Sequence, residues 1–165
     1  MADLWSQLED QLETQALAVL GATNDDLRIV TVVIDEVYDI DYLADHYELP
    51  ALLIITTDAD EQAGPHGDGV QHLDIAYPVH LVAVAPAGFK RDAQRNAKEL
   101  RRRLLAFLRN LTVQAALAHV TGDDGETVQQ ILFDNSGATY FGPANETEGQ
   151  FYSVAGVRFT IHTLV

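Results

Sequence analysis

Apolar positions along the chain follow two spacings, which predict helices in some segments and strands in others. Over residues 3–20 apolar side chains return every third or fourth position, as on a helix with one buried face, and Gly21 predicts its end. The same spacing predicts a long helix over residues 90–108 and a short one over residues 113–120. The expected buried face of the long helix consists of Ala93, Ala97, Leu100, Leu104, Leu108 and Leu111.

Strands are predicted where β-branched residues cluster or where apolar and polar residues alternate. Such segments are residues 28–34, 50–57, 127–133 and 151–164, with a shorter one around residues 139–141. The longest alternation runs from Leu73 to Leu81 and predicts a strand that continues to Pro86. Pro78 removes a backbone donor inside this strand, so we expect a sheet edge or a bulge there.

The segments between these elements are rich in acidic residues, glycine and proline. Residues 35–49 hold six acids and three tyrosines and predict a solvated loop or a short helix. Residues 58–69 hold three glycines, a proline and four acids and predict a loop. The order of elements predicts one domain, residues 1–165, of the α+β class. We expect a mostly antiparallel or mixed β-sheet, with the N-terminal helix and the long central helix packed on one face.

The charge of the chain is strongly acidic and unevenly distributed. There are 25 Asp and Glu residues against 10 Lys and Arg, a net charge of −15, which argues against nucleic acid as a direct ligand. Eight of the ten bases lie within residues 90–109, where there are only two acids. An Asp-rich, Lys-poor surface stays hydrated at high salt, so a halophilic source is one hypothesis and ordinary acidic solubility is the other.

Cellular location is constrained only by what the sequence lacks. There is no cysteine, which excludes disulfides and thiolate metal sites. The first residues lack the basic start of a signal peptide. Apolar runs reach about nine residues, whereas a membrane-spanning helix needs about 20. We therefore expect a protein that folds in a cytoplasm and has no membrane partner.

Residues with catalytic or metal-binding chemistry do not form a convincing pattern. His66, Asp68, His72 and Asp74 could approach one another, but their spacing matches no metal site. Asp58–Glu61 lacks the regular ligand positions of a calcium loop. No glycine motif for phosphate and no serine elbow is found. We therefore interpret these acidic segments as hydrated loops. We expect a protein that is not an enzyme and has no catalytic, cofactor-binding or metal-binding residues.

The basic segment 90–109 is the strongest functional signal. It could be a solvated helix face or, against the net charge, a patch for nucleic acid. It could also dock against an acidic surface, including that of an identical neighbour in a ring. The third hypothesis best explains why the bases are concentrated on one element of an acidic protein. The expected interface residues are Arg91, Arg95, Arg101, Arg102, Arg103, Trp5 and Phe151.

The order of these elements resembles the tail terminator and tail-completion (neck) proteins of long-tailed viruses. The segments that carry the resemblance are the opening helix Leu4–Leu20, the strand Leu73–Val84, the helix Ala93–Leu108 and the closing strand Phe151–Ile161. The resemblance covers the organisation of most of the chain and includes no diagnostic motif. It implies a structural virion subunit, without catalytic residues, that forms a hexameric ring. Such a ring caps the tail tube and joins it to the head-proximal neck.

The implied partners are further copies of the chain, the tail tube protein, and neck or head-completion proteins. The implied location is the tail or neck of the virion, which is assembled in the host cytoplasm. The alternatives are another neck or head-completion protein, or a cellular non-catalytic binding module. The module would hold a protein or a small ligand through residues 58–69 or through the basic helix. The mass in solution separates a ring from a monomer.

Overall fold

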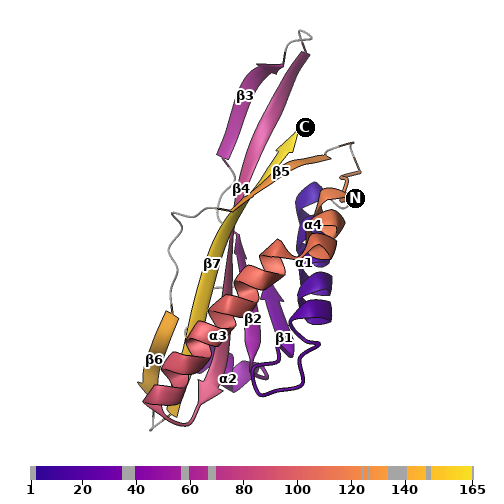
Figure 1. Ribbon diagram of the computed structural model, residues 1–165. Coiled ribbons are helices and arrows are strands. Elements are labelled where there is room, and N and C mark those ends of the chain that lie inside the picture. Colours follow the sequence, from indigo (N-terminus) through magenta and orange to yellow (C-terminus); the bar gives the residue numbers. More distant parts are fainter. Residues whose placement is uncertain are drawn as a thin grey trace.

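Two long antiparallel strands form the centre of the computed structural model (Figure 1). They are β4 (Val70–Ala87) and β7 (Gln150–Leu164), and residues 74–87 of β4 pair with β7. The structure describes residues 3–34, 40–56, 60–66, 70–123, 125, 127–133, 141–147 and 150–164.

The described strands form one sheet in the order β1-β2-β4-β7-β5. β1 (Thr31–Ile34) is parallel to β2 (Ala51–Thr56), and all other pairs are antiparallel. β5 (Thr127–Phe133) and β6 (Phe141–Thr147) pair with different parts of β7. This mixed, mostly antiparallel sheet, combined with helices, confirms the predicted α+β class.

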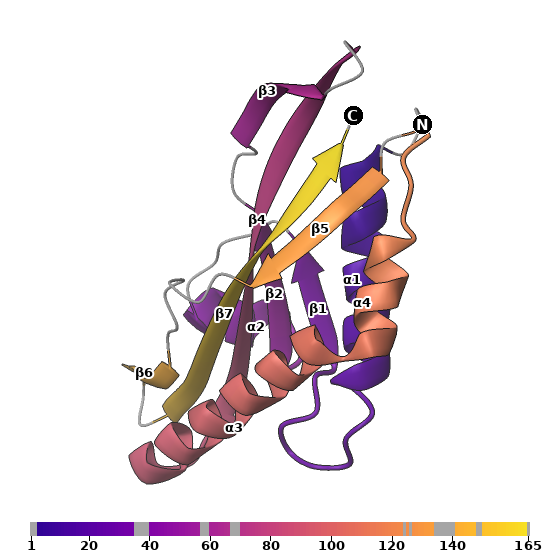
Figure 2. The same ribbon diagram turned by 45° about the horizontal axis from the view of Figure 1, so that its top comes forward.

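Three helices cover one face of the sheet (Figure 2). They are α1 (Leu4–Val19), α3 (Lys90–Arg109) and α4 (Leu111–Ala118). Alternate residues of the two central strands enter the main core on this face, namely Val79, Leu81, Ala83, Ala85, Ala155, Val157, Phe159 and Ile161. The predicted packing of the N-terminal and long central helices on one face is therefore confirmed.

The first helix begins and ends where the sequence predicts. The Asp3 carboxylate accepts a hydrogen bond from the Ser6 backbone N–H at 2.7 Å, which satisfies a donor of the first turn. The buried side chains are Leu4, Leu8, Leu12 and Ala16. Gly21 follows the helix at a point where an added Cβ would lie 2.3 Å from the Leu17 carbonyl oxygen. A larger residue at position 21 would therefore displace the backbone.

The buried face of α3 agrees with the prediction except at its end. Ala93, Ala97, Leu100, Leu104 and Leu108 are buried, but Leu111 is 80% exposed, so its assignment to this face is wrong. The reason is Asn110, whose side chain accepts hydrogen bonds from the backbone N–H groups of residues 112 and 113 and starts a new helix. The chain turns there, so the buried face of α3 ends at Leu108, and it also includes Phe107, which the prediction left out.

The opposite face of the sheet carries α2 (Ile40–His46). Leu43 of α2 is 1% exposed. It belongs to a second core cluster together with Val33, Leu53, Val84, Tyr152 and Val154. The predicted loop or short helix over residues 35–49 is thus a helix over residues 40–46, and it lies on the sheet face turned away from α3.

The predicted loop over residues 58–69 is wrong for residues 60–66, which form strand β3 (Asp60–His66). β3 pairs with residues 70–76 of β4, so β4 begins at Val70, before the expected Leu73. A β-ladder joins backbone groups and can therefore form despite unfavourable side chains. β3 and residues 70–76 of β4, which we call the arm, project beyond the helices (Figures 1 and 2).

Pro78 lies where the described part of β4 has a neighbour on one side only. The pairing of β2 with β4 ends at Val79, and the pairing of β3 ends at Ala76. On the other side, Pro78 lies opposite Thr160 of β7. Residues 57–59, which connect β2 to β3, lie outside the described residues, so the edge or bulge expected at Pro78 stays a prediction.

Other element boundaries differ from the prediction by a few residues. β1 begins at Thr31 because its first partner is Ala51, the first residue of β2. α4 begins at Leu111 because Asn110 caps it. β6 covers residues 141–147, whereas the sequence predicts a strand around residues 139–141.

The two leucines at positions 104 and 111 should respond differently to truncation. We expect Leu104→Ala to lower the free energy of unfolding by about 2–5 kcal/mol, because it leaves a cavity in the main core. Leu111→Ala should change it by no more than about 0.5 kcal/mol, because the side chain is exposed. Urea unfolding of both variants measures the difference. Equal losses would mean that the helix break at Asn110 is misplaced.

Candidate functional site

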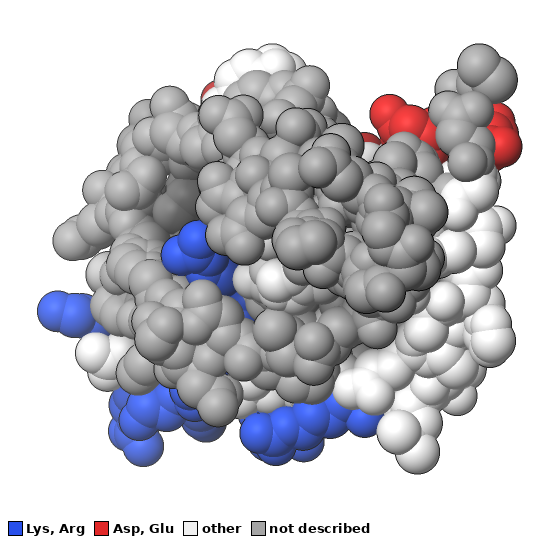
Figure 3. Space-filling view, turned by 90° about the horizontal axis from the view of Figure 1, so that it is seen from above, with Lys and Arg blue, Asp and Glu red and all other residues white. Residues whose placement is uncertain are grey.

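The outward side of α3 carries a line of basic residues. A helix turns by about 100° per residue, so the positions opposite the buried face can be read from it. They are Arg91, Arg95, Lys98, Arg102 and Arg109, all exposed, and we call them the basic stripe. From residue 91 to 109 the stripe is about 27 Å long. Figure 3 shows Lys and Arg side chains gathered along one margin of the molecule.

Intramolecular ion pairs leave most of the stripe's charge accessible. Arg95 approaches Asp92 at 3.1 Å, and Arg102 approaches Glu99 at 2.6 Å. The two arginine side chains remain 74% and 68% exposed, and such pairs contribute little to stability. Arg91, Lys98 and Arg109 have no ion pair with any side chain that the structure describes.

Arg103, an expected interface residue, lies on the flank of α3 against the loop that follows α1. Its side chain is only 15% exposed and forms an ion pair with Asp25, in the segment that follows α1. Arg103 Nη1 donates to Asp25 Oδ1 at 2.9 Å, and Arg103 Nε donates to Glu99 Oε1 at 3.0 Å. Arg103 therefore joins α3 to the loop between α1 and β1, and it does not belong to the basic stripe.

The two carboxylates of this cluster titrate below their ordinary range. Hydrogen bonds from Arg102 and then from Arg103 lower the pKa of Glu99 from its ordinary 4.5 to about 2. The hydrogen bond from Arg103 lowers the pKa of Asp25, and the Leu27 backbone N–H adds to this effect. Groups with a depressed folded pKa stabilise the fold above their unfolded pKa, and this contribution is lost as the pH falls.

Two further residues expected at the interface do not lie on the stripe. Arg101 is half-buried, and its Nε is enclosed without a hydrogen-bond partner. Trp5 is half-buried and packs against the main core from α1. Of the arginines expected at the interface, the structure thus brings together Arg91, Arg95 and Arg102.

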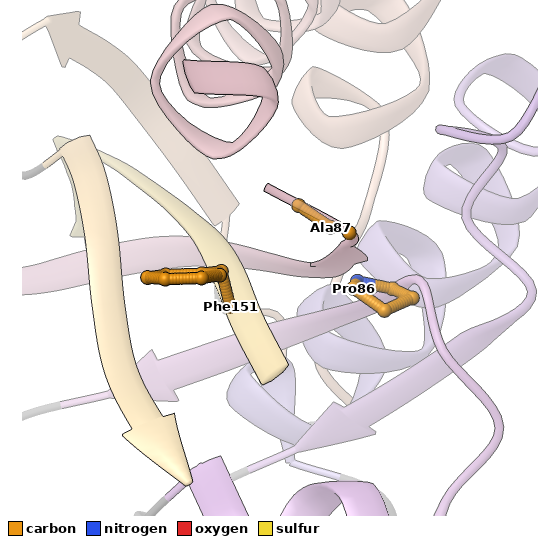
Figure 4. Close-up of a pocket in the computed structure, with 4 residues that line it drawn as sticks. Pro86, Ala87 and Phe151 are labelled. Carbon is orange, nitrogen blue, oxygen red and sulfur yellow. The ribbon is translucent and has the colours of Figure 1, made fainter. Parts of the chain in front are cut away.

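Phe151 lies at the start of β7, at the end of the sheet where α3 begins. It is half-buried and lies opposite Ala87 in the β4–β7 ladder. Together with Pro86, Ala87 and Gly88 it lines an open pocket of about 320 Å³, which we call the apolar notch (Figure 4). Phe89, the next residue after the notch, is 72% exposed. Phe89 is not among the interface residues expected from the sequence. A phenylalanine between a glycine and a lysine at the start of a helix indicates an exposed aromatic side chain and could have identified it.

An acidic groove adjoins the apolar notch, and Pro86 lines both. Its volume is about 410 Å³, and its charged lining consists of Asp25, Asp26, Glu48 and Arg28. Asp25 is already paired with Arg103, but Asp26 and Glu48 are exposed. The groove therefore offers exposed carboxylates beside apolar surface.

Asp45 of α2 and the basic stripe lie on opposite faces of the same sheet. Residues 35–48, which we call the acidic segment, hold six acids and no Lys or Arg. The segment includes α2, which packs on the sheet face away from α3, and its Asp45 and Glu48 are exposed. Of the acids described in this segment, Asp45 therefore lies across the sheet from the basic stripe, whereas Glu48 lines the acidic groove together with Asp25.

The expected absence of a metal site stays a prediction. Asp68 lies outside the described residues, as do Asp58 and Ala59, and the structure gives only the backbone of His66, His72 and Asp74. Within the side chains that are described, no group of three His, Asp or Glu residues could hold a metal ion. Within the same part of the chain, no helix combines the length and the apolar character needed to cross a membrane.

No protein-family model matches the chain, and no curated protein sequence matches it either. The resemblance to tail terminators therefore rests on the order of the elements and stays an expectation.

Loss of the Arg103 ion pairs should weaken the fold. We expect Arg103→Ala to lower the free energy of unfolding at pH 7 by about 1–2 kcal/mol, since the pairs are partly exposed and partly screened. The difference from wild type should shrink as the pH falls from 4.5 towards 2, because Glu99 and Asp25 become protonated there in the unfolded chain. Urea unfolding between pH 7 and pH 2 measures both effects.

Lys98→Ala is the matched control, because Lys98 is exposed and lies on the same helix. It should leave the unfolding midpoint at its wild-type value across this pH range. A difference between wild type and Arg103→Ala that stayed constant down to pH 2 would contradict the assigned pairing.

Proposed function

We propose that this chain is a structural subunit that assembles with copies of itself into a ring. The order of its elements resembles that of the tail terminators of long-tailed viruses, and the proposed subunit is one of them. The single observation that carries self-assembly is the arm, which extends past the helices that cover the rest of the sheet (Figure 1).

A two-stranded ribbon in water is marginally stable when it stands alone. Residues 70–73 of β4 pair with β3 alone among the described strands, and β3 pairs with β4 alone. Open backbone edges of this kind bind other strands, and monomeric proteins usually shorten or cover them. An arm of this length is therefore better explained in a subunit whose neighbours cover it.

The virion assignment rests on the element order described above. Under this proposal the ring is a hexamer that contacts the tail tube protein on one side and neck or head-completion proteins on the other. Nucleic acid is not a direct ligand, since 25 acids against 10 bases disfavour it. The proposed location is the tail or neck region of the virion.

The alternative is a cellular binding module without catalytic function. The apolar notch favours it, because an open pocket of about 320 Å³ beside the exposed Phe89 suits an apolar side chain of a partner or a small ligand. A protein that remained monomeric would favour this alternative.

Light scattering coupled to size-exclusion chromatography tests self-assembly. We expect a mass close to six times the 18.1 kDa of one chain at micromolar concentration. The same measurement is made on an arm-deleted variant, in which a six-residue Gly-Ser linker replaces residues 60–72. It should melt cooperatively but assemble less than the wild type, because it lacks most of the arm.

A wild-type protein of 18.1 kDa at every concentration would contradict the proposal. An arm-deleted variant that assembled as well as the wild type would remove the observation on which it rests.

A further inference from the structure

We infer that two copies of this chain join through a two-fold contact in which Phe89 of each copy enters the apolar notch of the other. The occupant of the notch is therefore a second copy of the same chain. Residue 76, where the arm ends, and residue 86, where the notch begins, lie about 33 Å apart along β4 (Figure 1). The inference thus goes beyond the proposed function, because the contact needs neither the arm nor a ring.

Phe89 stands at a position where its side chain does not stabilise the helix that it precedes. It is the N-cap of α3 but makes no side-chain capping hydrogen bond, and it is 72% exposed. Ser, Thr, Asp and Asn are the residues favoured at an N-cap, because their side chains accept hydrogen bonds from the first turn. A residue that departs from a local rule in this way indicates a function outside the subunit. Aromatic side chains carry much of the binding energy at protein interfaces, so a contact with another molecule accounts for it.

The apolar notch has the lining and the volume that a phenyl ring requires. It lies where β4 ends beside the start of β7, and it is lined by Pro86, Ala87, Gly88 and Phe151 (Figure 4). Its volume is about 320 Å³, whereas an apolar cavity of about 150 Å³ already holds a benzene ring. An added Cβ on Gly88 would meet no atom within 4 Å, so this space is open. Phe151 offers an entering ring an aromatic partner.

The position of Phe89 beside the notch determines the symmetry of the contact. Gly88, which lines the notch, directly precedes Phe89, so one small patch carries both a projecting ring and the space for a ring. The exposure of Phe89 shows that its ring does not fill the notch of its own subunit. A patch that is complementary to itself joins two copies about a two-fold axis, and each copy contributes the same residues. Both rings are then buried in one contact.

The charged residues beside this patch are complementary as well. Lys90 and Arg91 follow Phe89, are exposed, and form no ion pair with any side chain that the structure describes. The acidic groove adjoins the notch and exposes the carboxylates of Asp26 and Glu48. Because the bases adjoin the ring and the carboxylates adjoin the notch, an inserted ring brings opposite charges of the two copies together. Such charges orient the encounter and raise its rate.

Two substitutions at the contact test the inference. Phe89→Ser removes the ring and supplies a capping side chain, so α3 should be at least as stable as in the wild type. Gly88→Leu places a side chain in the open space of the notch. Thermal melts show that both variants still fold.

The readout is the mass in solution, measured by light scattering on the full chain. Small interfaces are weak, so the concentration series runs from about 1 µM to about 1 mM. Over this range the wild-type mass should double, whether the species at low concentration is a ring or a single chain. Each variant should need a concentration about tenfold higher or more for the same doubling. Leu111→Ser is the matched control, because it removes an exposed apolar side chain that does not line the notch, and it should double as the wild type does.

Photo-cross-linking locates the inserted ring. Phe89→p-benzoylphenylalanine keeps an aromatic side chain at position 89 and makes it reactive under ultraviolet light. In a mixture of unlabelled and ¹⁵N-labelled protein, mixed-isotope peptides should join position 89 to residues 86–88 or to Phe151 of another copy.

Three results would overturn this inference while leaving the proposed ring in place. They are a wild-type ring whose mass does not double up to the highest concentration, doubling that persists unchanged in Phe89→Ser, and mixed-isotope links that fall only outside the notch. Conversely, a wild type that reaches only two copies, with this pairing weakened in Phe89→Ser, would support the inference and contradict the ring. A wild type that stayed a single chain at every concentration would overturn both proposals.

Discussion

The packing of α3 against the sheet determines the direction of every charged residue on that helix. Ala93 and Ala97 are completely buried, and the Ser153 hydroxyl of β7 donates a buried hydrogen bond of 2.9 Å to the Ala93 carbonyl oxygen. Further along, Leu100, Leu104 and Phe107 continue into the core. Once this face is fixed, the rotation of the helix is fixed as well, and five bases necessarily point outward. A rotation of one residue, about 100°, would bury a guanidinium group in place of an alanine or a leucine.

The same constraint places Arg103 and the arginines of the stripe in different surroundings. Arg103 falls on the flank of the helix, where it reaches Asp25 and stabilises the loop that follows α1. The arginines of the stripe fall opposite the core, where ion pairs within the subunit contribute little. The basic segment therefore serves both stability and surface charge. Exposed charges more than about 8–10 Å apart are screened at physiological salt, so close contacts and apolar neighbours must support any docking.

Much of the fold could be predicted from the sequence because it follows from local periodicity. The buried leucines of α1, the long helix and the alternating central strands all appear as patterns within one element. β3 could not be predicted, because its glycine, proline and acidic residues indicate a loop, and only its pairing with β4 makes it a strand. Leu111 fits the helical spacing, but the Asn110 cap interrupts the helix before it.

The basic stripe could be predicted only in part, for a related reason. The concentration of bases on one helix is visible in the sequence, so Arg91, Arg95 and Arg102 could be named. Arg103 differs from them only by its position around the helix relative to a distant residue, Asp25, which is 78 positions away. Likewise, the sequence shows Asp45, but its position on the sheet face away from α3 follows only from the packing of Leu43.

Zero-length carbodiimide cross-linking tests self-assembly most directly, because the chain has only two lysines, Lys90 and Lys98. A mixture of unlabelled and ¹⁵N-labelled protein distinguishes links between copies from links within one copy. The account predicts mixed-isotope peptides that join Lys90 or Lys98 of one copy to a carboxylate of another copy. A sample at micromolar concentration that gave cross-links only within single copies would contradict it.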